Sequence, residues 1–161
     1  MMIGDIVRQA GRSVIALLIL GVGLAVGGCA QSPTMLDLKV EAANNINPDP
    51  GGRAAPLVVT LYQLKSTAAF DAADYFQLVD KPANALGDSL VASEQVVVVP
   101  GQALSLPRQF DPGAQYVGII AAFRSIDRAK WRVNAPVPAG KKTSLTALID
   151  GLALALKPAG N

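Results

Sequence analysis

Cys29 is the only cysteine in this 161-residue chain, and it directly follows an uninterrupted apolar run. Export signals combine a basic start, an apolar core and small residues at the cleavage point. Two arginines precede the core at Val14–Val26, and the run closes with the sequence Val-Gly-Gly-Cys. We therefore predict a lipoprotein signal over residues 1–28 that is cleaved between Gly28 and Cys29, with a lipid on the Cys29 thiol.

Two other interpretations of this segment stay open. One is a permanent transmembrane helix, because no charged residue lies between Arg12 and Asp37. The densely apolar part is only 13 residues long, however, whereas a membrane-spanning helix needs about 20. The other is ordinary secretion with cleavage near Ala30. The length of the core and its Val-Gly-Gly-Cys ending favour the lipoprotein signal.

The residues after Cys29 bear on the location of the folded part. Ala30 and Gln31 follow the cysteine, and neither is the aspartate that commonly retains lipoproteins in the inner membrane. We therefore expect an outer-membrane anchor with the domain facing the periplasm. Residues 29–34 form the anchor and linker, and the five residues after Cys29 reach about 17 Å at most. The domain, which we place at residues 35–158, must lie close to its membrane.

Composition limits the fold. The 132 residues after Cys29 suffice for one domain with a hydrophobic core but not comfortably for two. With Cys29 lipidated no disulfide can form, so stability must come from packing. A formal net charge of only +2 gives no electrostatic case for binding nucleic acid, which requires a clustered basic face.

The chain contains no histidine, which removes the commonest general acid or base and a common metal ligand. Without a free thiol as well, Ser-His-Asp and Cys-His catalysis and the usual zinc or copper sites are excluded. Asp71 and Asp74 lie one helical turn apart, but turn formation and helix starts explain such acids more simply. We predict no enzymatic activity, no metal, no cofactor and no small-molecule substrate.

Short strands separated by turns dominate the rest of the chain. Met35–Ala43 alternates apolar and polar residues, as a half-buried strand does. Pro56–Lys65 is rich in β-branched residues, and the apolar Tyr116–Arg124 predicts a strand covered on both faces. Seven or eight strands with frequent turns indicate an all-β fold, a β-sandwich. The remaining predicted strands are Ser89–Val99 and Gln102–Pro107, paired as a hairpin, then Trp131–Val137 and Thr143–Leu156.

One segment has helical rather than strand periodicity. Ser66 or Thr67 can cap a short helix that continues through Val79, and Pro82 ends it. Its apolar residues recur at intervals of three and four, so the helix should pack on the sheet. Four aromatic side chains are expected in the core: Tyr62, Phe70, Tyr75 and Phe76.

The connection between the first two strands is long for a compact domain. Asn44–Arg53 is dense in turn-forming residues. Long loops tend to be functional or disordered, and a flexible loop without function stays an alternative here.

A second polar feature is a run of basic residues around a tryptophan. Partner or anionic-lipid binding is conceivable for them, but a solvated hairpin beside Asp127 is the simpler interpretation. For Trp131 we favour a core or edge-packing position over an exposed anchor. The basic residues are Arg124, Arg128, Lys130 and Arg132.

Four segments together resemble one known family. They are the lipobox at Cys29, Leu-Tyr-Gln-Leu-Lys at 61–65, Phe-x-x-x-Asp-Tyr-Phe at 70–76, and Tyr116–Arg124 followed by Trp-Arg at 131–132. Their order and spacing are similar to those of the TssJ family, also called SciN or VasD. These proteins are outer-membrane lipoproteins of the type VI secretion system.

The resemblance implies a transthyretin-like β-sandwich with one added helix and a structural role in a membrane complex. Family members bind the periplasmic C-terminal region of the inner-membrane protein TssM, with TssL in the same complex. The family's partner-binding loop corresponds here to residues 44–55, in which Asn45, Asn47, Asp49 and Arg53 are the candidate contacts.

Two alternatives of different kinds stay open. One is a generic periplasmic lipoprotein with a similar sandwich that binds a small ligand, a carrier protein or peptidoglycan. The other is a hydrolase that uses Asp71 and Asp74 as paired carboxylates.

Overall fold

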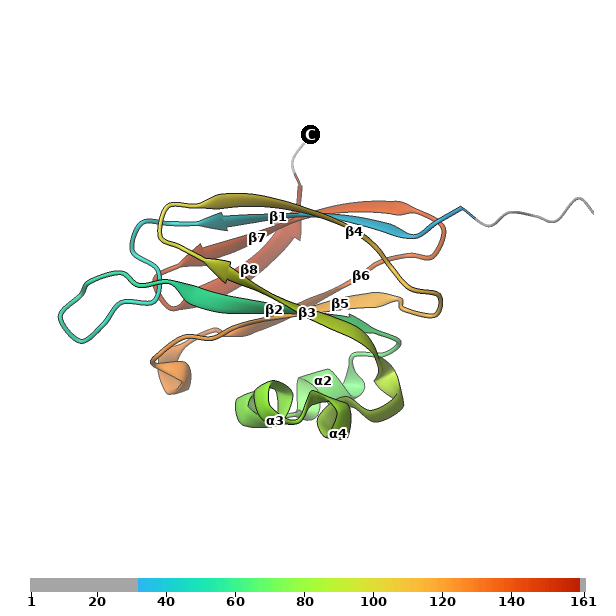
Figure 1. The fold of residues 1–161 in the computed structure, drawn as a ribbon, viewed down its shortest axis with the longest axis horizontal. Helices are drawn as coiled ribbons and strands as arrows, with labels where there is room; N and C mark the ends of the chain where they lie inside the picture. The colour runs from blue at the N-terminus through green and yellow to red at the C-terminus, as the bar shows by residue number, and fades with distance from the viewer. Residues whose placement is uncertain (1–31, 160–161) are drawn as a thin grey trace, which may run out of the picture. The chain divides into compact units, whose positions relative to one another are not determined.

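The computed structural model describes residues 32–159, and within them eight strands form two facing sheets (Figure 1). The predicted lipoprotein signal, Gly28 and Cys29 lie outside the described residues. One sheet has the order β4-β1-β7-β8 and the other β3-β2-β5-β6, so the predicted β-sandwich is confirmed. The strands are β1 Met35–Ala42, β2 Leu57–Leu64, β3 Leu90–Val98, β4 Ala103–Gln109, β5 Tyr116–Ala121, β6 Arg132–Pro136, β7 Lys142–Asp150 and β8 Ala153–Pro158.

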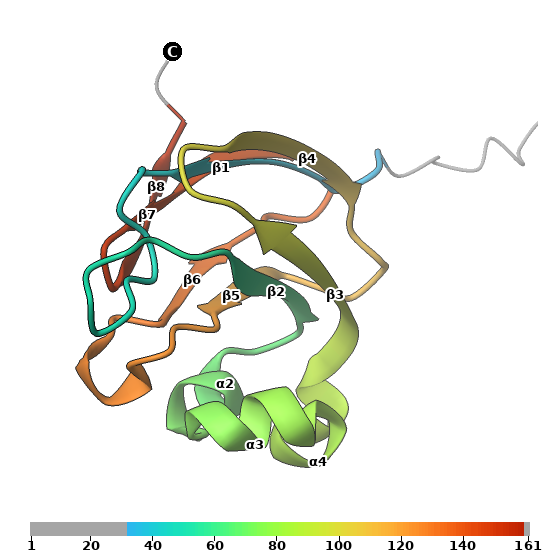
Figure 2. The same ribbon diagram turned by 60° about the vertical axis from the view of Figure 1, so that its left-hand side comes forward.

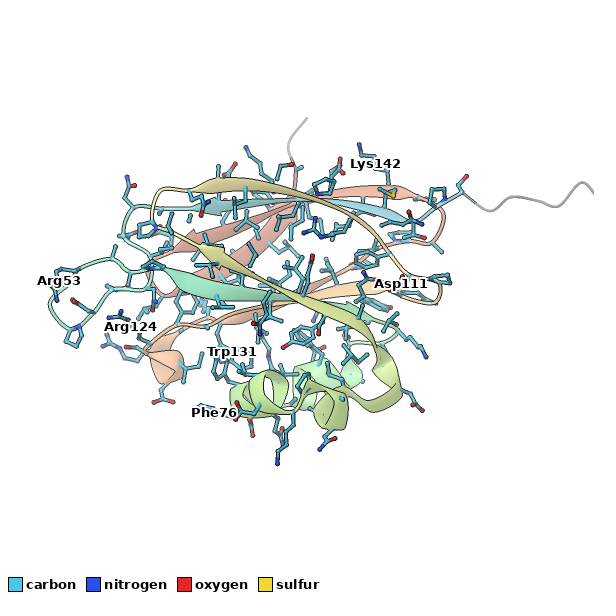
Figure 3. The ribbon with its side chains drawn as sticks, in the orientation of Figure 1. Arg53, Phe76, Asp111, Arg124, Trp131 and Lys142 are labelled. Atoms are coloured by element: carbon cyan, nitrogen blue, oxygen red, sulfur yellow. The ribbon has the colours of Figure 1, made fainter. Side chains whose placement is uncertain are left out.

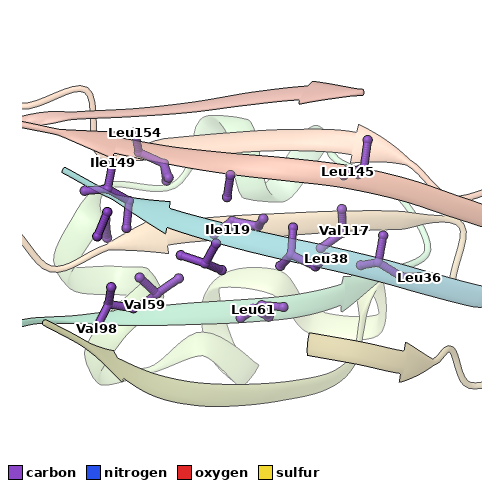
Figure 4. Packing of buried hydrophobic residues seen from close by; sticks show 14 of the residues in the cluster. Leu36, Leu38, Val59, Leu61, Val98, Val117, Ile119, Leu145, Ile149 and Leu154 are labelled. Atoms are coloured by element: carbon purple, nitrogen blue, oxygen red, sulfur yellow. The ribbon is translucent and has the colours of Figure 1, made fainter. Parts of the chain in front are cut away.

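The space between the sheets is filled by one hydrophobic cluster (Figure 4). β1 shows how the sequence produces it, because Leu36, Leu38 and Val40 are buried while the residues between them face outward. Asp37, on the outward face, pairs with Lys142 at 2.7 Å. Each such buried aliphatic side chain contributes about 1.5–3 kcal/mol. Alternation along the strands therefore accounts for the main core without a disulfide.

A second, smaller cluster lies on the outer face of the β3-β2-β5-β6 sheet, under a layer of short helices (Figure 2). Tyr62 and Ile120 from the sheet meet Phe70 and Leu78 from the helices. Close approach requires Gly118, since a Cβ there would lie 2.9 Å from two ring carbons of Phe70. β5 is thus covered on both faces, as its apolar sequence predicts.

The prediction of one helix was wrong, because three short helices and a 3₁₀ turn occupy this region. They are α2 Ala68–Ala72, α3 Tyr75–Asp80, α4 Pro82–Leu86 and η1 Gly87–Ser89. The chain is extended at Ala73, and Asp74 starts a new helix with a capping box, its carboxylate accepting from the Gln77 amide at 2.8 Å. Pro82 begins α4, where its missing N–H costs nothing. Apolar periodicity continues across these breaks and therefore hid them.

The predicted hairpin of Ser89–Val99 and Gln102–Pro107 was also wrong. β3 pairs with β2 and β4 pairs with β1, so the turn at Pro100-Gly101 crosses from one sheet to the other. Pro107 has no N–H to donate to a neighbouring strand, and it lies in the edge strand β4, where this is tolerated. The turn sequence fixes a reversal of the chain but not the partner of each strand.

Thr143–Leu156, predicted as one strand, forms most of two. Asp150 pairs with Ala153 across the turn residues Gly151 and Leu152. Gly151 has φ +55°, a value that glycine adopts freely at the first position of a two-residue hairpin turn. The two-residue turn shifts the buried face from odd-numbered residues in β7 to even-numbered ones in β8, as the pairing of Ile149 with Leu154 shows, and the sequence interpretation missed this change of phase.

The aromatic predictions divide. Tyr62 and Phe70 are buried as expected, and the Tyr62 hydroxyl donates to the Leu78 carbonyl at 2.8 Å. Burial raises the pKa of Tyr62 to about 12. Trp131 packs at the edge of both clusters, with its ring 5.3 Å from that of Tyr75, so its predicted edge position is confirmed. Phe76 is 63% exposed on α3, and its placement in the core was wrong.

Candidate functional site

The connection from β1 to β2 projects from one end of the sandwich, where the ends of several strands meet (Figure 1). Its neighbours there are the β3–β4 turn, the β7–β8 turn and the β5–β6 connection that contains η2, Ile126–Arg128. The Gly101 amide donates to the Ala43 carbonyl at 3.1 Å, and the Asn47 amide donates to the Gly151 carbonyl at 2.8 Å. The loop is therefore attached to the β3–β4 and β7–β8 turns.

Two apolar residues bury the base of the loop. Ile46 has 0% of its surface exposed and belongs to the main core, and Ala55 is buried opposite it. The Ala55 amide donates to the Ile46 carbonyl at 3.1 Å, which closes the base as a strand pair would. Burial of Ile46 requires that the chain turn back into the core before the loop projects outward.

Asn47 holds the base from inside. It is 2% exposed and has φ +49°, the left-handed region that asparagine tolerates better than most residues. Its side-chain amide donates to the Pro56 carbonyl at 2.9 Å, and its side-chain oxygen accepts from the Arg124 amide at 2.9 Å. One buried side chain thus joins the loop to the start of β2 and to the chain beyond β5.

The tip of the loop is organised around Asp49. One carboxylate oxygen accepts from the amides of Gly51 and Arg53, both at 2.9 Å, and the other accepts from the Arg53 guanidinium at 2.9 Å. The Asp49 amide donates back to the Arg53 carbonyl at 2.9 Å. The Asp49 side chain is only 13% exposed, whereas the Arg53 side chain is 88% exposed. The tip therefore turns its carboxylate inward and presents the Arg53 guanidinium to solvent.

These hydrogen bonds favour the charged form of Asp49. The bond from the Arg53 amide is the largest cause that lowers the pKa of the carboxyl below 3.8, and the Arg53 side chain, the Gly51 amide and the charge of Arg124 add to it. Burial acts in the opposite direction. The carboxylate is therefore ionised at neutral pH and remains able to order the tip.

The structure thus gives the four predicted contact residues three different environments. Arg53 is exposed at the tip (Figure 3), Asp49 orders the tip, and Asn47 is buried with its polar atoms bonded inside the chain. Asn45 is exposed, and its oxygen accepts from the Gly151 amide over a long 3.4 Å. Sequence alone gave no sign that Asn47 is internal, because asparagine is usually a surface residue.

The basic residues around Trp131 also separate. Arg124, Arg128 and Lys130 are exposed on the β5–β6 connection, near the loop. Arg132 instead points to the helices, donating to the carbonyls of Phe70 at 3.0 Å and Ala73 at 2.8 Å, while its guanidinium lies 4.9 Å from the Trp131 ring centre. The interpretation of Arg132 as part of a solvated hairpin was wrong, because it serves as a C-terminal cap for α2.

Elsewhere the described residues offer little chemistry. Asp71 accepts from the Asn134 amide at 2.8 Å and Asp74 caps α3, so the two acids of the hydrolase hypothesis lie on different helices with separate partners. Residues 32–159 contain no cluster of three or more His, Cys, Asp or Glu side chains that could hold a metal ion. In the same range no helix is long and apolar enough to cross a membrane.

A family model described as "Type VI secretion lipoprotein, VasD, EvfM, TssJ" matches residues 34–152. The chain belongs to this family. The match spans strands β1 to β7, the helices and the loop at 44–55, and the description names a secretion lipoprotein and not an enzyme. The resemblance seen in the sequence is thereby confirmed.

Solved structures agree with this assignment. The type VI lipoprotein TssJ1 from Pseudomonas aeruginosa is 35% identical, with a TM-score of 0.77, and the match covers 80% of this chain and 98% of that one. Serratia marcescens Lip, described as a membrane-bound component of the type VI secretion system, is 28% identical with a TM-score of 0.70 over 80% and 98% of the two chains.

A third solved structure adds the name of another protein. A chain in a structure described as "T6SS protein TssM C-terminal domain (869-1107) from EAEC" is 27% identical, with a TM-score of 0.67 over 78% of this chain and 98% of that one. No curated protein matches the chain.

Proposed function

We propose that the chain is an outer-membrane-anchored structural lipoprotein of a type VI secretion membrane complex. Its loop at 44–55 binds the periplasmic C-terminal region of a TssM-like inner-membrane protein, with TssL in the same complex. In this proposal residues 1–28 are a signal that is removed, residues 29–34 carry the lipid and form a linker, and residues 35–158 form the periplasmic domain.

The solved structure described by its TssM domain supports the choice of partner. The match covers 98% of the chain in that structure and 78% of this 161-residue protein. That chain is therefore far shorter than the TssM segment 869–1107 in the description. A solved complex of the two proteins would contain such a chain, similar to a lipoprotein, beside a TssM domain.

The observation that carries the proposal is the contrast within the loop. Its base is buried through Ile46 and Asn47, while its tip projects and presents Arg53. A loop that is ordered before binding loses less conformational entropy when it docks. Arginine is also enriched among the residues that dominate binding energy at interfaces.

The geometry supports different roles for the candidate contacts. Arg53 and Asn45 are exposed and would touch the partner directly. Asp49 would keep the Arg53 backbone in place through its hydrogen bonds. Asn47, which we predicted as a contact, would act as a positioning residue, because its side chain is already bonded to Pro56 and Arg124.

The lipid supplies the other attachment. One acyl chain gives marginal membrane binding, at about 0.8 kcal/mol for each buried methylene, whereas two or more chains hold firmly. A triacylated Cys29 would keep the domain at the membrane permanently. Metabolic labelling with palmitate should mark the wild-type protein and leave a Cys29→Ser variant unlabelled and free in the periplasm.

Co-purification tests the partner. The protein should be isolated from detergent-solubilised envelopes of cells that express the secretion system, with the Cys29→Ser variant as the control for anchoring. We expect a TssM-like protein to co-purify with the wild type. Its absence in repeated preparations that retain the lipoprotein would reject the proposal.

The generic ligand-binding alternative receives less support. The open edge between β3 and β4 holds a cavity of about 200 Å³ lined in part by Tyr62, Glu94 and Arg108. Binding pockets for small molecules are usually about 300–1,000 Å³ and enclosed, whereas the larger hollows, such as one of about 410 Å³ beside Phe76 and Asn84, lie open at the surface. The Glu94 and Arg108 side chains at this cavity also pair with each other at 2.6 Å, which leaves them less free to bind a ligand.

A further inference from the structure

The chain enters the sandwich beside the turn between β6 and β7. The Gly140 amide donates to the Thr34 hydroxyl at 2.9 Å, and the Phe110 amide donates to the Thr34 carbonyl at 2.9 Å. The Met35 amide donates to the Lys141 carbonyl at 2.9 Å. The backbone is therefore fixed from Thr34 onward, and no flexible spacer separates the fixed part from the first strand.

Chain length then limits how far this end can stand from the lipid. Cys29 precedes Ser32 by three residues, a reach of about 10 Å, and precedes Thr34 by five, a reach of about 17 Å. β1 runs from Met35 to Ala42 toward the opposite end, a distance of about 26 Å for its eight residues. The loop at 44–55 therefore lies at the opposite end of the sandwich from Thr34 and the β6–β7 turn (Figures 1 and 2).

The end of the sandwich at the β6–β7 turn carries two exposed lysines. Lys141 is exposed and makes no ion pair among the residues that the structure describes. Lys142 is exposed beside it and pairs with Asp37 at 2.7 Å. Two further charged residues, Lys65 and Asp111, lie at this end. Lys65 follows Leu64, whose carbonyl accepts from the Gln115 amide, and Asp111 lies in the neighbouring turn.

We propose that the β6–β7 turn, residues 137–141, docks on the headgroup layer of the bilayer, with Lys141 and Lys142 against lipid phosphates. This rests on the proposed lipidation of Cys29. A lysine near an anionic bilayer surface favours binding by roughly fivefold, too little to hold a protein alone. A tether of about 10–17 Å keeps the turn near the surface, where so weak an attraction suffices to orient the domain.

The consequence is a defined orientation. With the turn at 137–141 against the headgroups, β1 rises from the membrane and directs Arg53 toward the middle of the periplasm. A freely rotating domain on the same tether would present the loop in every direction. Docking therefore reduces the orientations that a partner arriving from the inner membrane must search.

Cysteine labelling tests the proposal cleanly, because Cys29 is the only native cysteine and its thiol would be blocked by the lipid. Ala139, in the turn, and Ala54, in the loop, are both exposed, so Ala139→Cys and Ala54→Cys make a matched pair. The full acylated protein, labelled with a fluorophore at either site, would be reconstituted in vesicles of phosphatidylethanolamine and phosphatidylglycerol. A nitroxide-labelled headgroup lipid then reports proximity by quenching.

We expect strong quenching at Ala139→Cys and none at Ala54→Cys. Adding Lys141→Gln should lower the docking equilibrium roughly fivefold, and Lys130→Gln, at the loop end, should leave it unchanged. Salt should weaken docking, since exposed charges are screened within about 8 Å at physiological ionic strength. Equal quenching at both sites, or no effect of Lys141→Gln, overturns the docking proposal while the protein stays on the vesicles. Failure of the wild type to be acylated overturns the proposed function as well.

Discussion

The base and the tip of the loop at 44–55 are built in opposite ways. Ile46 and Asn47 at the base are buried, and their bonds run to β2, to the β5–β6 connection and to the β7–β8 turn. The tip makes its side-chain hydrogen bonds within itself, through Asp49, and exposes Arg53. The difference implies a division of labour in which the base supports the fold and the tip is available to a partner.

Ile46→Ala should give the largest difference in stability between the base and the tip of the loop. Truncating a fully buried isoleucine removes apolar contacts and leaves a cavity, so Ile46→Ala should lower the free energy of unfolding by about 2–5 kcal/mol. Urea unfolding measures this, with Pro50→Ala at the exposed tip as the control, for which we expect a change below about 1 kcal/mol. Equal losses for the two variants would show that the base is not part of the core.

Asn47→Ala should give the next largest effect. It leaves the Arg124 amide and the Pro56 carbonyl, both in part-buried hydrogen bonds, without these partners, at about 0.5–1.5 kcal/mol for each bond lost. Asn45→Ala, which loses only a long 3.4 Å bond at the surface, should change stability by less than about 0.5 kcal/mol. Asn47→Gly separates the two causes, since it relieves the φ of +49° but restores no hydrogen bond. An Asn47→Ala protein of wild-type stability would contradict the role of the Asn47 side chain in holding the loop to Pro56 and Arg124.

Arg53→Ala should affect binding without affecting stability. The side chain is 88% exposed, so unfolding should change by less than about 0.5 kcal/mol. Affinity for the TssM region should fall about tenfold if the side chain is an interface anchor. Calorimetric titration measures the affinity, and Lys142→Ala at the opposite end provides the control. Unchanged affinity for Arg53→Ala would remove Arg53 from the interface.

Acid should loosen the tip before the base. The pKa of Asp49 is lowered in the folded protein, so the order that it supports is complete above 3.8 and is lost as pH falls through the lowered value. The amide resonances of Gly51 and Arg53 should therefore titrate together in NMR spectra, with an apparent pKa below 3.8, while that of Asn47 stays unchanged. Titration at or above 3.8 would mean that the tip is not ordered by this carboxylate.

The fold was largely predictable because strands and turns leave local marks. The alternation in Met35–Ala43 follows directly from one buried face, and the apolar Tyr116–Arg124 follows from two. What could not be predicted depends on distant partners. The turn at Pro100-Gly101 fits a hairpin locally, yet β4 pairs with β1. The helical region breaks at Asp74 because a side chain caps it there, which apolar spacing does not record.

The site divides in the same way. The length and composition of the loop marked it as unusual, and the structure shows it projecting from one end of the sandwich. The burial of Asn47 was not predictable, because its partners Pro56 and Arg124 lie 9 and 77 residues away in sequence. Arg132 was likewise unpredictable as a cap, since Phe70 and Ala73 precede it by 62 and 59 residues.

Replacing residues 49–53 with Gly-Gly tests the central claim most directly. The amide of Asp49 already bonds the Arg53 carbonyl at 2.9 Å, so a short turn can close the same gap while the base stays intact. Thermal unfolding and calorimetric titration with the TssM C-terminal region would be measured on the same preparation. The account predicts a melting temperature close to that of the wild type together with loss of binding. Binding of wild-type strength to the shortened protein would contradict it.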